Sequence, residues 1–450
     1  MSGIAELLVN LGHDVSGSDL LASPITDRLQ SLGVRFTQGH DAHNVAGADL
    51  VVVSAAVPTA NPEREAATLL GTPVVSRGAM LAELAGLKRA IVVVGSHGKT
   101  TTTAMVTVAL SAGGLDPTAV IGGRLSVLGS NARLGAGDLM VVEADESDRS
   151  FLKLSPEMSV LTNIDDEHLE AYSGMDDLEA SFLAFARRTP PHGWFVACVD
   201  DPRVRRIVSQ IPERVVTYSL DDPSAEVSAR DVELGPSASR FRVVVAGKKE
   251  SDLGTEVALA VPGRHNVQNA LAAFAIARKL GVPHDAIARA FEEFTGADRR
   301  FQSYGEVDGV TVVDDYAHHP TEIVAALATA RLRQPRRLRV VFQPHRYSRT
   351  LRLLDRFGEA LAAADELVLT QVYAASETPI PGATSEALAA AVRRVADVPT
   401  RLATSLDDAV AIVTHDVRPG DLILTLGAGS IATVPPRVVS VLRDRTRRDD

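Results

Sequence analysis

The 450-residue sequence is nearly free of cysteine and has no long apolar runs, and each absence excludes a class of protein. A single cysteine, Cys198, rules out a disulfide framework and a cysteine-rich metal site. Acidic residues outnumber basic ones by 57 to 46, and the net charge of −11 disfavours a nucleic-acid partner. No run approaches the roughly 20 apolar residues of a membrane helix, and no basic-then-apolar leader opens the sequence. We therefore expect a cytoplasmic enzyme with no nucleic-acid or membrane partner.

Apolar residues are nevertheless plentiful, at 45% of the chain, and they are grouped in a regular way. Short β-branched runs alternate with longer segments of helical character, which predicts an α/β fold with parallel sheets. The runs are continuous rather than alternating, as in strands covered on both faces. The expected strands lie at residues 49–57, 90–95, 138–145, 158–164, 310–316, 338–344, 366–372 and 421–429.

The length exceeds that of one ordinary domain, and two stretches suit boundaries: residues 84–89 and 294–300. A polar, broken region near residues 212–260 predicts a small antiparallel annex of the middle domain. The expected domains are residues 1–86, 87–296 and 297–450.

The chain opens with a helix where a Rossmann-type unit would have a strand. Residues 1–12 read as an amphipathic helix, and a strand follows near residues 13–19. A dinucleotide-type unit places a strand and a glycine-rich loop before that helix. We expect about 15 further residues, one strand and one loop, ahead of the first residue given. The alternative is a domain that simply begins with a helix.

A phosphate-binding loop is predicted at residues 95–103, GSHGKTTTT, between an apolar strand and an apolar helix. Gly95 and Gly98 let backbone N–H groups converge on phosphate oxygens, and Lys99 can reach the β- and γ-phosphates. The Thr100 hydroxyl can bind Mg²⁺. The spacing is two residues shorter than the usual pattern, and the alternative is a glycine turn with a surface lysine.

Acidic side chains follow the next expected strand, in EADESD at residues 143–148. Glu143 is the first polar residue after that strand, and His168 lies just beyond another, so both side chains could converge on one Mg²⁺. The alternative for His168 is a helix cap or a surface position. The other acids nearby, Asp145, Asp148, Asp165 and Asp166, could be solvated or could support the ligands from behind.

Four further clusters carry polar side chains. His265, Asn266 and Asn269 stand at the head of an Ala-rich helix, where the Asn amides could read adenine or Asn266 could cap the helix. DRRFQ, at residues 298–302, could clamp a phosphoryl group or form a surface ion pair. DDYAHHPTE and FQPHRYSRT end two expected strands at residues 314–322 and 342–350, and together they favour a site for a carboxylate or phosphate.

Together with MSGIAELLVNLGHDVSGSDL at residues 1–20 and VYAASETPIPGA at residues 372–383, these strings resemble the Mur ligase family, in particular its alanine-adding member, and they occur in family order from residue 1 to beyond residue 380. The resemblance implies three domains: Rossmann-like N- and C-terminal domains flanking a central P-loop ATPase-like domain. It also implies ATP-dependent joining of L-alanine to the lactyl carboxylate of UDP-N-acetylmuramate through an acyl phosphate. Peptidoglycan synthesis, and with it cell-wall biogenesis, cell shape and cell division, would be the context.

The family motifs imply roles residue by residue. The nucleotide would contact Gly95, Ser96, His97, Gly98, Lys99, Thr100, Thr101, Asn266, Asn269, Arg300 and Asp315. Mg²⁺ would be held by Thr100, Glu143 and His168. The sugar nucleotide and amino acid would contact Ser18, Asp19, Ser54, His319, Arg346 and Arg349. The catalytic residues would be Lys99, His168, Arg300, His345, Arg346 and Arg349.

The sequence departs from the family pattern in three places. The opening strand and glycine loop are absent, Ser430 replaces an acid, and no lysine between Lys153 and Lys248 can serve as the carbamylated metal bridge of sister ligases. The last departure favours the alanine-adding member. Two alternatives remain: the recycling ligase that adds a whole tripeptide, and an inactive nucleotide binder.

Overall fold

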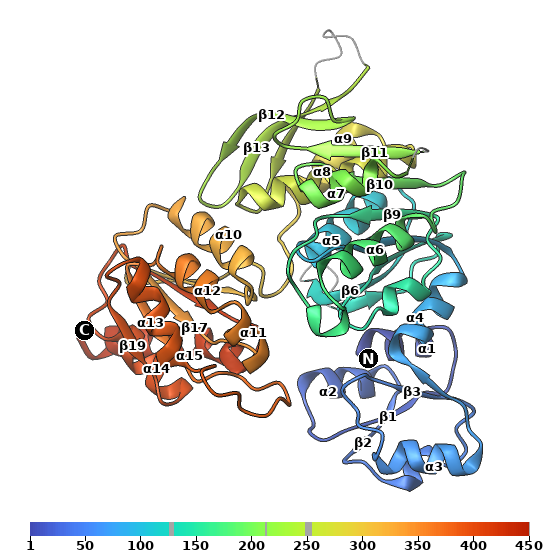
Figure 1. The fold of residues 1–450 in the computed structure, drawn as a ribbon, viewed down its shortest axis with the longest axis horizontal. Helices are drawn as coiled ribbons and strands as arrows, with labels where there is room; N and C mark the ends of the chain where they lie inside the picture. Colours follow the sequence, from blue (N-terminus) through green and yellow to red (C-terminus); the bar gives the residue numbers. More distant parts are fainter. Residues whose placement is uncertain (126–129, 212–213, 248–253, 450) are drawn as a thin grey trace. The chain divides into compact units, whose positions relative to one another are not determined.

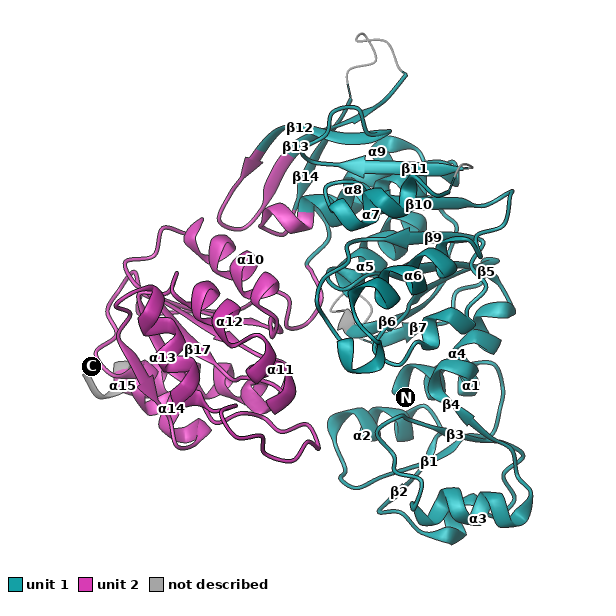
Figure 2. Cartoon of the chain, viewed as in Figure 1, with its two compact units in different colours: residues 1–232, 241–259, 267–295 teal, residues 233–240, 260–266, 296–450 magenta. Residues whose placement is uncertain are grey.

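The computed structural model describes residues 1–125, 130–211, 214–247 and 254–449, which divide into two compact units (Figure 2). The first unit comprises Met1–Val232, Phe241–Leu259 and Val267–Thr295. The second comprises Glu233–Arg240, Ala260–Asn266 and Gly296–Asp450. The three-domain limits expected from the sequence stay predictions.

The N-terminal part of the first unit contains two small parallel sheets (Figure 1). β1 (Ser16–Asp19) pairs with β2 (Arg35–Gln38), and β3 (Val51–Val53) pairs with β4 (Val74–Ser76). Within the described residues no strand joins β1 to β3. The intervening helices are α1 (Ser2–Asn10), α2 (Pro24–Ser31), η1 (Ala42–Val45), α3 (Pro62–Leu70) and α4 (Arg77–Gly86).

A ten-stranded sheet forms the centre of the first unit, in the order β14-β13-β12-β11-β10-β9-β5-β8-β6-β7. β5 pairs in parallel with both β8 and β9, so the carboxyl ends of these three strands lie at one edge. The strands are β5 (Arg89–Val94), β6 (Thr118–Leu125), β7 (Ser130–Arg133), β8 (Leu139–Glu143), β9 (Met158–Leu161), β10 (Trp194–Cys198), β11 (Val215–Ser219), β12 (Val227–Leu234), β13 (Ser239–Val245) and β14 (Thr255–Leu259).

The strands of the polar region near residues 212–260 belong to the ten-stranded sheet, and the antiparallel pairing expected there is wrong for β11. That strand pairs in parallel with both β10 and β12. The remaining helices are α5 (Lys99–Ala112), η2 (Ser150–Lys153), η3 (Leu169–Ala171), α6 (Met175–Ala186), α7 (Pro202–Val208), α8 (Arg264–Lys279) and α9 (His284–Glu292).

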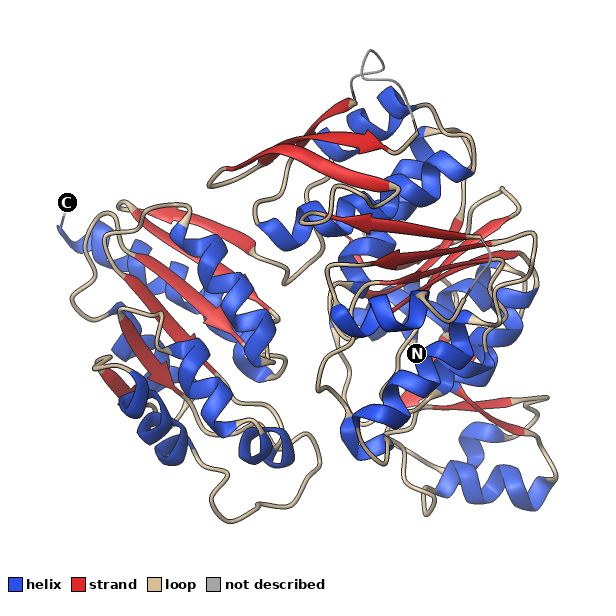
Figure 3. Ribbon diagram, turned by 45° about the horizontal axis from the view of Figure 1, so that its top comes forward, coloured by secondary structure: helices blue, strands red, loops and turns tan. Residues whose placement is uncertain are grey.

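The second unit contains a six-stranded sheet with helices on both faces (Figure 3). One apolar core lies on each face, and β20 is buried along its whole length, as the continuous apolar run LILTL predicts. β15 is antiparallel to β16, and the other pairings are parallel. In sheet order the strands are β15 (Gln302–Val307), β16 (Val310–Asp315), β20 (Leu422–Leu426), β17 (Leu338–Phe342), β18 (Glu366–Leu369) and β19 (Thr400–Leu402).

Several helices of the second unit begin at a residue whose side chain caps them, and that cap fixes where the preceding loop ends. Thr384 and Ser405 each accept a backbone N–H at the start of a helix. The helices are α10 (Pro320–Arg331), α11 (Tyr347–Arg352), α12 (Leu354–Leu361), α13 (Ser385–Val395), α14 (Leu406–Thr414), η4 (Ser430–Thr433) and α15 (Val434–Asp449). Across the described ranges, none of the helices has both the length and the apolar character that crossing a bilayer requires.

Candidate active site

The predicted phosphate loop connects β5 to α5 at the carboxyl edge of the central sheet. Gly95 and Gly98 have φ values of +133° and +80°, which favour glycine. A Cβ at Gly95 would lie 2.1 Å from Thr162 Oγ1, so no larger residue fits against β9 there. The loop therefore has the strand, turn and helix context that phosphate binding needs.

The loop is also hydrogen-bonded to the segment that follows β9. Ser96 N–H donates to the Asn163 carbonyl at 3.0 Å, and His97 N–H donates to Asn163 Oδ1 at 2.8 Å. Asp165 N–H donates to Ser96 Oγ at 2.8 Å, and the Asp165 carboxylate lies 3.0 Å from His97 Nε2. Asp165 is thus part of the loop's support rather than a solvated acid.

Lys99 is buried among carboxylates at the start of α5. Its Nζ lies 2.7 Å from Glu146 Oε2, an atom of the loop that follows β8. Burial disfavours the charged form of Lys99, but attraction from Glu146, Asp145 and Glu143 raises its pKa overall. The lysine is therefore a cation at neutral pH, as an interaction with phosphate requires.

Thr100 and Glu143 meet next to the loop, as the sequence predicts. The Thr100 hydroxyl donates to Glu143 Oε1 at 2.9 Å, and Gly122 N–H of β6 donates to the other carboxylate oxygen. A Cβ at Gly122 would lie within 2.7 Å of that carboxylate, so glycine there leaves room for Glu143. A hydroxyl and a carboxylate oxygen side by side are ligands that suit Mg²⁺.

His168 is grouped with acids other than the expected Glu143. One ring nitrogen of His168 and one oxygen each of Asp145 and Glu146 lie within 4.8 Å of one another. The backbone of His168 is left-handed, with φ +56°, at the start of η3. Glu146 was not singled out in the sequence, because the motif EADESD does not reveal which acid points at the lysine.

Asn269, on α8, contacts the phosphate loop although it lies far from that loop in the sequence. Its Oδ1 accepts the Thr102 hydroxyl at 3.1 Å, and a Cβ at Gly98 would come within 2.6 Å of it. Asn266 is the third residue of α8 and its amide donates to the Pro262 carbonyl at 2.7 Å. The capping alternative for Asn266 is therefore wrong, and a contact of either residue with adenine stays a prediction.

In the second unit, Asp315 ends β16 and is held by backbone groups. It accepts N–H groups from Phe301 at 2.8 Å and Ala317 at 2.7 Å. Burial raises the pKa of Asp315 to about 6, although Arg300 opposes that shift. Arg300 itself stacks on the Tyr316 ring at 5.1 Å and lies 3.8 Å from Glu322.

His345, Arg346 and Arg349 follow β17 and form one cluster. Arg349 Nη1 donates to His345 Nδ1 at 3.1 Å, and Arg349 is 4% exposed. The His345 ring stacks on Tyr373 with centroids 5.4 Å apart and an 11° angle, and Arg346 N–H donates to the Tyr373 carbonyl at 2.8 Å. The contact of Tyr373 with His345 was not predicted, because the string VYAASETPIPGA, to which Tyr373 belongs, carries the family resemblance but indicates no partner for the ring.

The two histidines of DDYAHHPTE have different environments. His319 is fully buried, and its Nδ1 accepts Thr321 N–H at the start of α10, so it acts as a helix cap. His318 lies 3.1 Å from Glu322, and its ring lies 5.9 Å from that of His345. His318 is therefore next to the arginine cluster, whereas a substrate contact of His319 stays a prediction.

The expected UDP-site residues lie in the N-terminal part of the first unit. The Ser18 hydroxyl donates to Glu63 at 2.7 Å and lies 3.1 Å from His40 Nδ1. Asp19 is exposed, and Ser54 is half-buried and accepts Ala56 N–H at 3.3 Å. Their contact with a substrate stays a prediction.

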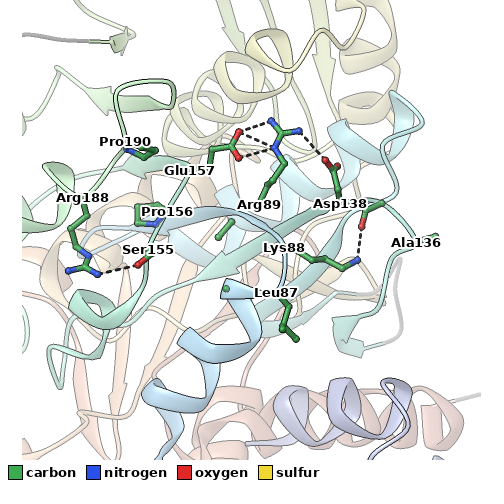
Figure 4. A pocket seen from close by; sticks show the side chains of 13 residues that line it. Leu87, Lys88, Arg89, Ala136, Asp138, Ser155, Pro156, Glu157, Arg188 and Pro190 are labelled. Atoms are coloured by element: carbon green, nitrogen blue, oxygen red, sulfur yellow. Dashed lines mark hydrogen bonds and ion pairs between the residues drawn. The ribbon is translucent and has the colours of Figure 1, made fainter.

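A hollow of about 730 Å³ lies at the opposite, amino edge of the central sheet (Figure 4). Arg89 pairs there with Glu157 at 2.6 Å and with Asp138 at 3.1 Å. Lys88 Nζ donates to the carbonyls of Gly135 and Gly137. Arg89 is thus paired with both carboxylates of the hollow, and the loop between β5 and α5 is at the other end of the strands.

Known proteins resemble the chain along nearly its whole length. It matches a "Mur ligase family, catalytic domain" over residues 1–89, a "Mur ligase middle domain" over 93–277 and a "Mur ligase, glutamate ligase domain" over 299–429. The UDP-N-acetylmuramate–L-alanine ligase of Burkholderia ambifaria is 51% identical, with 99% of this chain and 96% of that protein covered. The enzyme of that name from Solibacter usitatus is 48% identical, with 98% and 93% covered.

Solved structures of Mur ligases also match the fold of this chain. The UDP-N-acetylmuramate–alanine ligase MurC of Thermotoga maritima matches with a TM-score of 0.84 at 29% identity, covering 99% of this chain and 97% of that one. A murein peptide ligase from Psychrobacter arcticus matches with a TM-score of 0.73 at 26% identity, covering 98% and 96%.

Proposed function

Because the chain belongs to the Mur ligase family, we propose that it joins L-alanine to the lactyl carboxylate of UDP-N-acetylmuramate, with conversion of ATP to ADP and phosphate. The observation that supports the proposal is a glycine loop with a buried Lys99 and with Thr100 next to Glu143, in a chain 51% identical to a relative named for that reaction. The product would enter peptidoglycan synthesis. ATP and a UDP-linked precursor place the activity in the cytoplasm.

The reaction proceeds in two steps. A lactyl carboxylate oxygen attacks the γ-phosphorus of ATP, and ADP leaves with formation of an acyl phosphate. The neutral amine of L-alanine then attacks the acyl carbon, phosphate leaves, and the nitrogen loses a proton as the amide forms. Phosphorylation is needed because a free carboxylate is a poor acyl donor, and cations must stabilise the transferring phosphoryl group.

Each candidate residue has a role in this reaction that follows from its chemistry. Lys99 would bind the β- and γ-phosphates, and the N–H groups of the loop would orient them. Thr100 and Glu143, with His168, would hold Mg²⁺, which supplies charge neutralisation when bound. Arg346 and Arg349 suit the carboxylate of the substrates or the acyl phosphate.

The decisive experiment measures ADP release by the full chain with ATP, Mg²⁺, UDP-N-acetylmuramate and L-alanine. We expect release that depends on L-alanine and that Lys99→Ala abolishes. Faster release with the tripeptide L-Ala–γ-D-Glu–diaminopimelate than with L-alanine would favour the recycling reaction. ATP binding without alanine-dependent ADP would indicate a nucleotide binder and overturn the proposal.

A further inference from the structure

The ammonium group of Lys99 is fully engaged by acceptors of the protein itself. Its Nζ donates to the Gly95 carbonyl at 2.6 Å, the Ser96 carbonyl at 3.1 Å and Glu146 Oε2 at 2.7 Å. An ammonium has three N–H donors, and these three contacts use them all. The side chain is thus turned back over its own loop.

Glu146 is an unusual partner for this lysine. The residue is 1% exposed, and its Oε1 has no hydrogen-bond partner among the described residues. Its backbone is fixed, since the Tyr172 hydroxyl donates to its carbonyl at 2.5 Å. A buried carboxylate with one oxygen unpaired is costly, and an apolar side chain of similar size would serve packing better.

ATP and Glu146 need the same ammonium. A bound β- or γ-phosphate requires donors from Lys99, yet Glu146 and two carbonyls already take them. The Glu146 carboxylate also repels phosphate oxygens. Binding of ATP must therefore exchange one anionic partner of Lys99 for another.

We propose that Glu146 is a positioning residue that holds Lys99 over the phosphate loop and must be displaced when ATP binds. The proposal rests on the ATP-binding part of the proposed function. The apparent Kd is the intrinsic Kd divided by the fraction of molecules in which Lys99 is released. A pair that is closed about nine-tenths of the time raises the apparent Kd about tenfold.

The test is calorimetric binding of Mg-ATP to the full chain without the other substrates. Glu146→Gln keeps the shape and removes the charge, and it should bind Mg-ATP about tenfold more tightly. Asp148→Asn is the matched control. It removes one negative charge from the same loop, where Asp148 accepts Ser150 N–H at 2.9 Å, and it should bind within about twofold of wild type.

A second pair of variants separates positioning from general charge repulsion. In a Lys99→Met background, Glu146→Gln should tighten Mg-ATP binding much less than it does in wild type, because the group that Glu146 holds is gone and only its charge repulsion is removed. Equal tightening in both backgrounds would overturn the positioning role. In turnover, the KM for ATP should fall while kcat stays within about twofold.

Unchanged or weaker binding by a folded Glu146→Gln variant would also overturn the inference. Should that variant not fold, Glu146→Asp replaces it. Its shorter side chain draws the carboxylate away from Nζ and should give intermediate tightening, and wild-type affinity would count against the inference. Failure of the wild-type chain to bind Mg-ATP would instead refute the proposed function.

Discussion

Gly98→Ala tests whether α8 supports the phosphate loop. Alanine at φ +80° costs about 1 kcal/mol. Its Cβ would also lie 2.6 Å from Asn269 Oδ1, so Asn269 must turn away and break its bond with Thr102. Loss of that buried hydrogen bond costs about 2 kcal/mol. The expected loss of stability is therefore about 3 kcal/mol in total.

Gly114→Ala is the matched control, because Gly114 has φ +76° and nothing within 4 Å of an added Cβ. It should cost only the backbone part, about 1 kcal/mol. Urea unfolding followed by tryptophan fluorescence measures the stability of the central sheet, since the single tryptophan, Trp194, lies on β10 of that sheet.

Mg-ATP binding supplies a second measurement. Gly98→Ala should weaken binding at least about tenfold, because displaced N–H groups no longer converge on phosphate, whereas Gly114→Ala should not. In the Gly98→Ala background, Asn269→Ala should cost less stability than in wild type, because it removes the crowded oxygen. Equal urea midpoints for the two glycine variants would refute the reasoning.

Two further predictions concern a metal ligand and a titrating group. Thr100→Val should raise the Mg²⁺ concentration needed for half-maximal ADP release about tenfold, because the hydroxyl is lost. Thr100→Ser keeps a hydroxyl and should need the same Mg²⁺ concentration as wild type. If Thr100→Val also needs no more Mg²⁺ than wild type, Thr100 is not a ligand. Burial, reinforced by Arg300, lowers the pKa of His265 to about 4 from 6.5. The unfolded chain then binds the proton more readily, so stability should fall as the pH drops from 6.5 towards 4. The loss should be about 2 kcal/mol, less than the full shift would give, because His265 is only half-buried. His265→Gln should flatten that dependence in thermal unfolding measured across the pH series, and an identical slope would contradict it.

Much of the central site could be predicted because it depends on short-range order along the chain. The run AIVVVG followed by SHGKT specifies a buried strand, a turn with positive φ and a helix, and the structure has β5, Gly95 and Gly98, and α5 in those places. Glu143 could be predicted as well. It is the last residue of a strand beside β5, and parallel neighbours end at the same edge.

The remaining features depend on contacts that no local pattern encodes. Asn269 lies against Gly98 although about 170 residues separate them in the sequence, and Tyr373 stacks on His345 from a string, VYAASETPIPGA, that indicates no partner for its ring. The choice of Glu146 rather than Asp145 as partner of Lys99 depends on how the loop after β8 turns. The parallel pairing of β11 with β10 and β12 could not be predicted, because the sequence of a polar strand does not show which strands will be its neighbours.

The places of β5 and β3 in their sheets also imply different rates of local opening. β5 has a strand on each side, so its amide hydrogens can exchange with solvent only when a large part of the sheet separates. β3 has a single partner, and its three valines are only half-buried, so it can fray alone. The loop between β5 and α5 is thus attached to a slowly relaxing framework, whereas the segment that carries Ser54 can open without disturbing that loop.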